Sequence, residues 1–153
     1  MKVEERKYNV YIANDGKEFK TEEACVNYEN FNLETKLREE IVRTINARDE
    51  AVARINYLKA NKYGLLSCLT KKIESEEKSF DLLIHNFKQM KSGKARTKAY
   101  SQISRKASDI FNIKTRLTDK QTDLKEDRKS LNRYNELIAS HTRKLQELKE
   151  KGN

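Results

Sequence analysis

Two long heptad repeats constrain the fold of this chain more than any other feature. Apolar residues recur at heptad spacing from Ile41 to Met90 and again from Ile103 to Leu148. The only turn signal between the two stretches is Ser92-Gly93. Two stretches of similar length on either side of one turn predict a long antiparallel coiled-coil helical hairpin. The composition agrees, because 37% of the residues are charged and proline is absent, as is typical of long helices.

The a and d positions of both arms can be read directly from the spacing. In the second arm, the a positions are Ile103, Ile110, Leu117, Leu124, Leu131, Ile138 and Leu145. In the first arm, the a positions are Ile45, Val52, Lys59, Leu66, Ile73, Phe80 and Phe87, and the d positions are Ile41, Arg48, Ile55, Lys62, Leu69, Glu76, Leu83 and Met90. A seam sustained over this length is a strong coiled-coil signal.

Gly64 is a break signal inside the first arm. A break there would turn the hairpin into a three-helix bundle, which is the alternative fold. The heptad phase read above crosses Gly64 unchanged, and a lone glycine costs only about 1 kcal/mol in a helix interior. We therefore expect one continuous helix through Gly64.

The turn also predicts which residues face each other. If Ser92 and Gly93 form the turn, the numbers of facing residues add up to about 185. Lys59 and Lys62 then lie opposite the region of Asp127 and Glu126, with Lys120 nearby. Polar seam positions that meet in this way can fix the register of a coiled coil.

Residues 1–32 predict a small head ahead of the hairpin, which would occupy residues 33–153. Tyr8–Ala13 alternates like a strand, Asp15-Gly16 is a tight-turn signal, and a short return strand follows at Glu18–Phe19. Thr21 is a good helix N-cap, which predicts a helix after the two strands. The head is therefore predicted to be a ββα unit. We expect its core to contain Val10, Ile12, Phe19, Cys25 and Tyr28.

The head also carries a family resemblance. Residues 11–29 read Y-I-A-x-D-G-K-E-F-x-T-E-E-A-C-x-x-Y-E. This pattern resembles the N-terminal motif of small phage and prophage accessory proteins of low-GC Gram-positive bacteria. It covers about an eighth of the chain, and it implies a viral accessory protein acting in the host bacterial cytoplasm.

A strongly basic segment surrounds the predicted turn. No acidic residue occurs between Asp81 and Asp109, although the chain as a whole carries 24 of them. The seven cations of this segment are Lys88, Lys91, Lys94, Arg96, Lys98, Arg105 and Lys106. Tyr100 lies among them, and Phe111 follows at an outward heptad position. Cations with aromatic residues predict a surface for nucleic acid or for an acidic protein.

The first arm has more apolar residues than a two-helix seam needs. Those outside its seam include Val42, Leu58, Leu65 and Ile84. They predict a second contact, made either with the head or with another copy of the chain, and a homodimer is the expected assembly.

The chain shows no signature of an enzyme, a metal site or a cofactor site. His85 and His141 lack partners at metal-ligand spacing, and Cys25 and Cys68 form no disulfide framework. No Gly-rich phosphate loop is present. The N-terminus lacks the apolar run of a signal peptide, so we expect a soluble cytoplasmic protein.

Three functions are compatible with these features. The first is a non-enzymatic effector that inhibits or redirects a host nucleic-acid-handling machine, such as a bacterial defence system. The second is a nucleic-acid-binding protein with little sequence preference, because no recognition motif is present. The third is a structural coiled-coil spacer or assembly factor whose basic charge is incidental.

Overall fold

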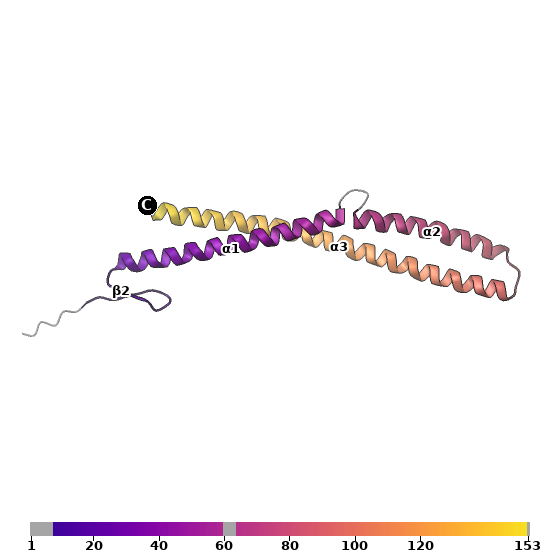
Figure 1. Cartoon of the computed structure of the whole chain (residues 1–153), viewed down its shortest axis with the longest axis horizontal. Helices are drawn as coiled ribbons and strands as arrows, with labels where there is room; N and C mark the ends of the chain where they lie inside the picture. Colours follow the sequence, from indigo (N-terminus) through magenta and orange to yellow (C-terminus); the bar gives the residue numbers. More distant parts are fainter. Residues whose placement is uncertain (1–7, 60–63, 153) are drawn as a thin grey trace, which may run out of the picture. The chain divides into compact units, whose positions relative to one another are not determined.

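The computed structural model describes residues 8–59 and 64–152. Its elements, in chain order, are β1 (Tyr11–Ile12), β2 (Glu18–Phe19), α1 (Glu22–Lys59), α2 (Leu65–Gln89) and α3 (Lys94–Lys151) (Figure 1). The predicted fold class, mostly helical with an N-terminal β-hairpin, is confirmed. The boundary expected after residue 32 falls inside α1, which continues from the head without interruption.

The chain forms two compact units. One combines Met1–Arg48 with Asn132–Asn153, and the other comprises Asp49–Leu131. We call them the terminal unit and the central unit. None of the helices in the described part of the chain is long and apolar enough to cross a membrane.

The head of the terminal unit is a minimal antiparallel hairpin. Tyr11 lies opposite Phe19 in the two strands. The turn between them is closed by a hydrogen bond of 2.8 Å from the Gly16 amide to the Ala13 carbonyl. Gly16 has a φ of +88°, a backbone conformation that side chains with a Cβ rarely adopt. The Asp-Gly signal therefore marks a real conformational requirement.

The hairpin is fastened to the start of α1 by polar and aromatic contacts. The Tyr28 hydroxyl donates a hydrogen bond of 2.7 Å to Asp15 Oδ2, and its ring lies 5.0 Å from that of Phe19. The Asn14 amide donates to Glu29 Oε1 at 2.9 Å. The predicted cap is confirmed, since Thr21 Oγ1 accepts the Ala24 amide.

The prediction of the head core is wrong for two residues. Cys25 is buried, but Val10 and Ile12 are exposed. Successive residues of a strand point to opposite faces, and the face that meets α1 is the one with Tyr11 and the buried Ala13. The outward face of a hairpin this short has nothing to cover it.

In the terminal unit, α1 pairs with the C-terminal part of α3. Glu40 Oε2 lies 3.5 Å from His141 Nε2, and Phe31 and Leu148 line the same shallow hollow nearer the chain ends. Residue numbers rise along α1 as they fall along α3, so the two segments are antiparallel. Leu37 is the buried apolar residue of α1 here.

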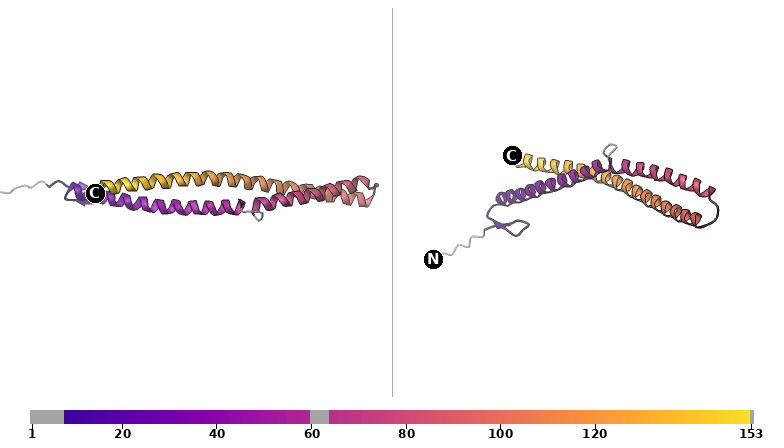
Figure 2. Two further views of the ribbon diagram at one scale, coloured as in Figure 1. Left: turned by 90° about the horizontal axis from the view of Figure 1, so that it is seen from above. Right: turned by 45° about the vertical axis from the view of Figure 1, so that its right-hand side comes forward.

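In the central unit, α3 packs first against α2 and then against the end of α1. The two helices α2 and α3 run side by side in both views of Figure 2. The cross-helix contacts Phe87–Tyr100, Glu76–Lys106 and Arg54–Asp127 have residue numbers that add up to 187, 182 and 181. These values lie close to the expected 185, so the antiparallel register is confirmed in this unit.

The expectation of a continuous helix through Gly64 is wrong. Helix α1 ends at Lys59, and α2 begins at Leu65 with Gly64 as its N-cap in an extended conformation. The break does not create a three-helix bundle in the central unit, because Arg54 of α1 and Glu76 of α2 contact successive stretches of α3.

The phase assigned to the first arm explains the error. Before the break, the buried positions are Ala51 and Leu58, whereas the assigned Val52 and Lys59 are exposed. After the break the assigned positions hold, with Ile73 buried and Leu66 half-buried. Leu58 and Leu66, the seam positions on either side of the break, are therefore eight residues apart, whereas an unbroken heptad repeat would space them by seven. A break near Gly64 absorbs the extra residue, and it also avoids placing a glycine inside a helix.

The same phase error affects the polar pairing around Asp127. The partner of Asp127 is Arg54, whose Nε and Nη2 both lie 3.0 Å from its Oδ1. Lys59 is exposed, and Lys62 lies outside the described residues. The expectation that a basic residue of the first arm pairs with Asp127 holds, but Lys59 is the wrong residue.

Asp127→Lys should destabilise the central unit. The Asp127 side chain is only 15% exposed, so a lysine there would meet Arg54 in a partly buried place. We expect a loss of about 1–3 kcal/mol and a melting temperature several degrees lower by circular dichroism. Asp119→Lys makes the same charge change at an exposed position of α3. Equal effects of the two substitutions would contradict the pairing.

Tyr28→Phe should alter the titration of Asp15. The hydrogen bond from the Tyr28 hydroxyl, helped by the Lys17 amide, lowers the pKa of Asp15 below its ordinary 3.8. A lowered pKa stabilises the head above the ordinary value, and this contribution is lost as the pH falls through the lowered pKa. The variant should move the pKa back toward 3.8 in a carbon-detected NMR titration of the carboxyl group. Tyr57→Phe is the control, and no shift on Tyr28→Phe would refute the bond.

Candidate functional site

The candidate site is the turn between α2 and α3 with its flanking residues 88–106, which we call the tip. Helix α2 ends with Met90 as its C-cap, and the Met90 amide bonds the Phe87 carbonyl. Gly93 has a φ of +145° and its carbonyl accepts the Thr97 amide at 3.1 Å. The predicted Ser92-Gly93 turn is thus confirmed, and glycine is required at its second position.

Arg96 fastens the two helices at the turn. Its Nη1 donates a hydrogen bond of 2.7 Å to the Met90 carbonyl, at the end of α2. Its guanidinium carbon also lies 4.5 Å from the centre of the Phe87 ring, in a cation–π contact. A cation at this place also offsets the negative end of the α2 dipole. Arg96, predicted as a binding residue, therefore has a structural role.

Lys106 is also used within the fold. Its Nζ lies 2.6 Å from Glu76 Oε2, and both side chains are about three-quarters buried. This cation faces α2 across the seam and is neutralised there, so it does not add to the free charge of the tip.

Five of the seven predicted cations remain on the surface. They are Lys88, Lys91, Lys94, Lys98 and Arg105, all of them exposed. Within the described ranges 8–59 and 64–152, none of these five takes part in an ion pair. The charge of these five side chains is therefore not neutralised by any residue in the described part of the chain.

Tyr100 lies among these cations in the sequence and is open to solvent. Its side chain is 65% exposed, and its ring centre is 6.3 Å from that of Phe87. A shallow hollow of about 310 Å³ is lined by Phe87, Ser92, Gly93, Arg96, Thr97 and Tyr100. Aromatic rings, hydroxyl groups and backbone thus form one surface at the turn.

The exposed tip residues of α3 fall on different sides of the helix. Lys94, Lys98 and Arg105 are spaced by four and seven residues, so they share one face. At 3.6 residues per turn, Tyr100 lies roughly 140° around the helix from these cations, and Thr97 lies between the two directions. Phe111, 69% exposed, is on the same side as Tyr100, about three turns beyond it. The exposed cations and the exposed aromatic residues of α3 therefore lie on separate faces.

The four residues predicted to make a dimer or head contact differ in how far they are exposed. Val42 is exposed in the terminal unit, whereas Leu65 and Ile84 are half-buried in the central unit. Leu58 is only 5% exposed and faces α3 within its own chain. Leu58 is therefore wrong as an outward contact, and the homodimer stays a prediction.

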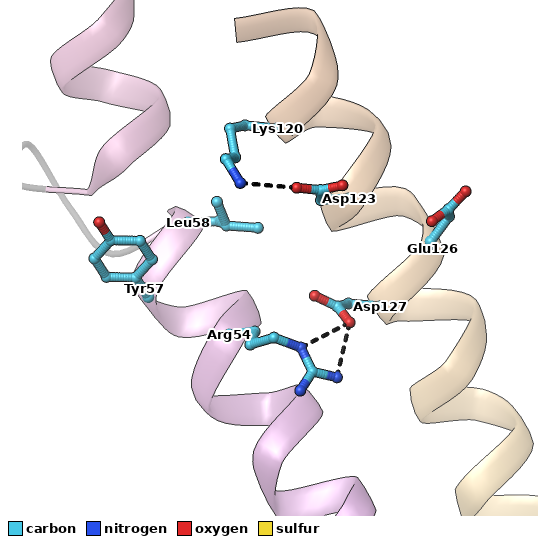
Figure 3. A pocket seen from close by; sticks show the side chains of 7 residues that line it. All are labelled: Arg54, Tyr57, Leu58, Lys120, Asp123, Glu126 and Asp127. Carbon is cyan, nitrogen blue, oxygen red and sulfur yellow. Dashed lines mark hydrogen bonds and ion pairs between the residues drawn. The ribbon is translucent and has the colours of Figure 1, made fainter. Parts of the chain in front are cut away.

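A second hollow, of about 410 Å³, lies between α1 and α3 of the central unit (Figure 3). Figure 3 shows Arg54 joined to Asp127 and Lys120 joined to Asp123, with Leu58 between the helices. Its charges are largely neutralised by each other, so we assign it to stability. Among the residues that the structure describes, no group of His, Cys, Asp or Glu could hold a metal ion.

Arg96→Ala should loosen the turn. Loss of the cation–π contact and of the bond to Met90 should weaken local stability by about 1 kcal/mol. Amide hydrogen exchange near residues 90–97 should become about fivefold faster. Lys98→Ala removes an exposed cation of the same helix and should leave the exchange unchanged. Unaltered exchange in Arg96→Ala would argue against a fastening role.

Comparison with known proteins adds no assignment to this geometry. No family model, no curated protein and no solved structure matches the chain. The resemblance of residues 11–29 to phage accessory proteins stays a prediction.

Proposed function

We propose that this protein is a non-enzymatic, phage-type effector that binds a nucleic-acid-handling complex of its bacterial host through the tip. The observation that carries the proposal is a set of five exposed cations at a turn whose sequence contains no acidic residue, and none of the five forms an ion pair within the described residues 8–59 and 64–152. Elsewhere in the chain lysines and glutamates are interspersed. A local excess of one charge attracts an oppositely charged partner and speeds their encounter.

A nucleic-acid-handling complex fits this charge in two ways. Its nucleic acid is a polyanion, and any acidic patch on its protein subunits would attract the same cations. The resemblance of the head to phage proteins supports a bacterial host. Inhibition of a defence system is the most specific form of the proposal.

Binding is a better assignment for the tip than catalysis. Its exposed side chains are ammonium, guanidinium, hydroxyl and aromatic groups. The acid-free sequence offers no carboxylate that could act with them as a general acid or base. Cations of this kind are suited to holding phosphates or carboxylates.

The alternative is a structural spacer whose tip charge is incidental. The long α3, with 58 residues, favours this alternative because an extended helix pair can separate two attachment points. The two functions differ in one respect: only an effector that uses the tip should depend on its cations.

Capture from a bacterial lysate tests the proposal. A tagged protein should retain a nucleic-acid-handling complex, identified by mass spectrometry, and the complex should dissociate as salt is raised. The combined variant Lys91→Gln, Lys94→Gln and Lys98→Gln should lose at least ten times as much of it as a matched control. The control, Lys71→Gln with Lys125→Gln and Lys129→Gln, removes the same charge from exposed positions near acidic residues. Equal retention by the two variants would favour the spacer.

A further inference from the structure

We propose that the tip holds single-stranded nucleic acid directly, with one base stacked on Tyr100 in the hollow and the flanking phosphates on the exposed cations that adjoin the hollow in the sequence. This inference rests on the proposed function and names the ligand within it. Its argument depends on the aromatic hollow, which the charge of the tip alone does not explain.

The surroundings of Tyr100 distinguish it from Tyr57, the other exposed tyrosine among the described residues of the central unit. Tyr57 is exposed to the same extent, 65%, but it lies in the hollow lined by Asp123, Glu126 and Asp127. Two cations and three carboxylates line that hollow, so a net negative charge remains there and would repel a phosphate backbone. Tyr100 has no acidic residue among its hollow's lining residues, which include Ser92 and Gly93 of the turn. A base can therefore reach Tyr100 without bringing its phosphates close to a like charge.

The hollow is also held in shape before any ligand arrives. Phe87 supports Tyr100 on one side and carries the Arg96 guanidinium on its ring. Arg96 is fixed in turn by its bond to the Met90 carbonyl. Groups that are already ordered lose less entropy on binding. Thr97 and Ser92 add hydroxyl groups at the rim, suited to hydrogen bonds with a base or a phosphate.

The exposed cations adjoin the hollow in the sequence. Each of four cations stands next to one of the lining residues Phe87, Ser92, Gly93 and Thr97; they are Lys88, Lys91, Lys94 and Lys98. A strand that crosses the turn can place its phosphates on these cations and turn one base toward Tyr100. Basic surfaces with aromatic platforms bind single strands in this way, largely without sequence preference. In a duplex the base faces are already stacked on each other, so they are not free to stack on Tyr100.

An acidic protein segment is the competing ligand. It would pair with the same cations, but its affinity would not depend on stacking against an exposed aromatic ring. The two ligands therefore differ in their dependence on Tyr100.

Fluorescence anisotropy of labelled oligonucleotides with the full chain tests the inference. The probes are a thymidine oligomer of about ten nucleotides, an abasic oligomer with the same number of phosphates, and a duplex of equal length. The thymidine oligomer should bind about tenfold or more tighter than the abasic one. Tyr100→Ala should remove this difference, Tyr100→Phe should keep it, and Tyr57→Ala should have no effect. Replacing Lys91, Lys94 and Lys98 with Gln should make the salt dependence shallower by about two units of log–log slope.

Equal affinity for the thymidine and abasic oligomers, tighter binding of the duplex, or no binding at all would overturn the inference. The proposed function fails separately. If nuclease-treated lysate still yields the host complex, and this capture still depends on the tip lysines, the tip binds an acidic protein and only the direct contact with nucleic acid is refuted. If capture does not depend on those lysines, the proposed function fails, whatever the oligonucleotides do.

Discussion

The apolar seam of α3 is the constraint on which both units depend. A single amphipathic helix is marginal in water, and most helical stability in proteins comes from packing its apolar face. In the central unit, Ile110 and Leu124 of α3 are buried. The helices that pack against them also bury apolar residues, Leu58 at the end of α1 and Leu69 and Ile73 in α2. No large side chain in the described part of the chain is completely enclosed. The fold is thus held by a narrow line of contacts, which leaves most of each helix surface free to carry charge.

The sequence predicted the seam of α3 correctly because that helix has one clear apolar series. Helix α1 carries two competing series, with Ala51 and Leu58 adjacent to Val52 and Lys59. A straight helix turns every 3.6 residues rather than every 3.5, so spacing alone does not choose between neighbouring series. In the structure, the series with Ala51 and Leu58 is the one that packs against α3. After the break before Leu65, the seam follows the heptad phase of Val52 and Lys59 again. Only the partner helix could supply that information.

The sequence predicted which residues make up the candidate site, but not which of them are engaged in contacts within the fold. The absence of acids between Asp81 and Asp109 identifies the tip from the sequence. Nothing in that pattern separates Arg96 and Lys106, which serve the fold, from the cations that remain free. The separation depends on contacts across the turn, to the Met90 carbonyl and to Glu76. Charge counting therefore overstates the free charge of a helical turn when some cations lie at seam positions.

The tip is arranged against local helix stability. Helix α1 begins with Glu22 and Glu23, which favour the positive end of a helix dipole, whereas the first turn of α3 contains no acid and starts with Lys94. Lys94 and Lys98 are four residues apart, a spacing at which like charges destabilise a helix by a few tenths of a kcal/mol. The fastening by Arg96 offsets this cost within the protein. A polyanion would relieve it further, because each bound phosphate removes repulsion that the free protein must tolerate. Departures from local stability of this kind are expected where a surface is built for a partner.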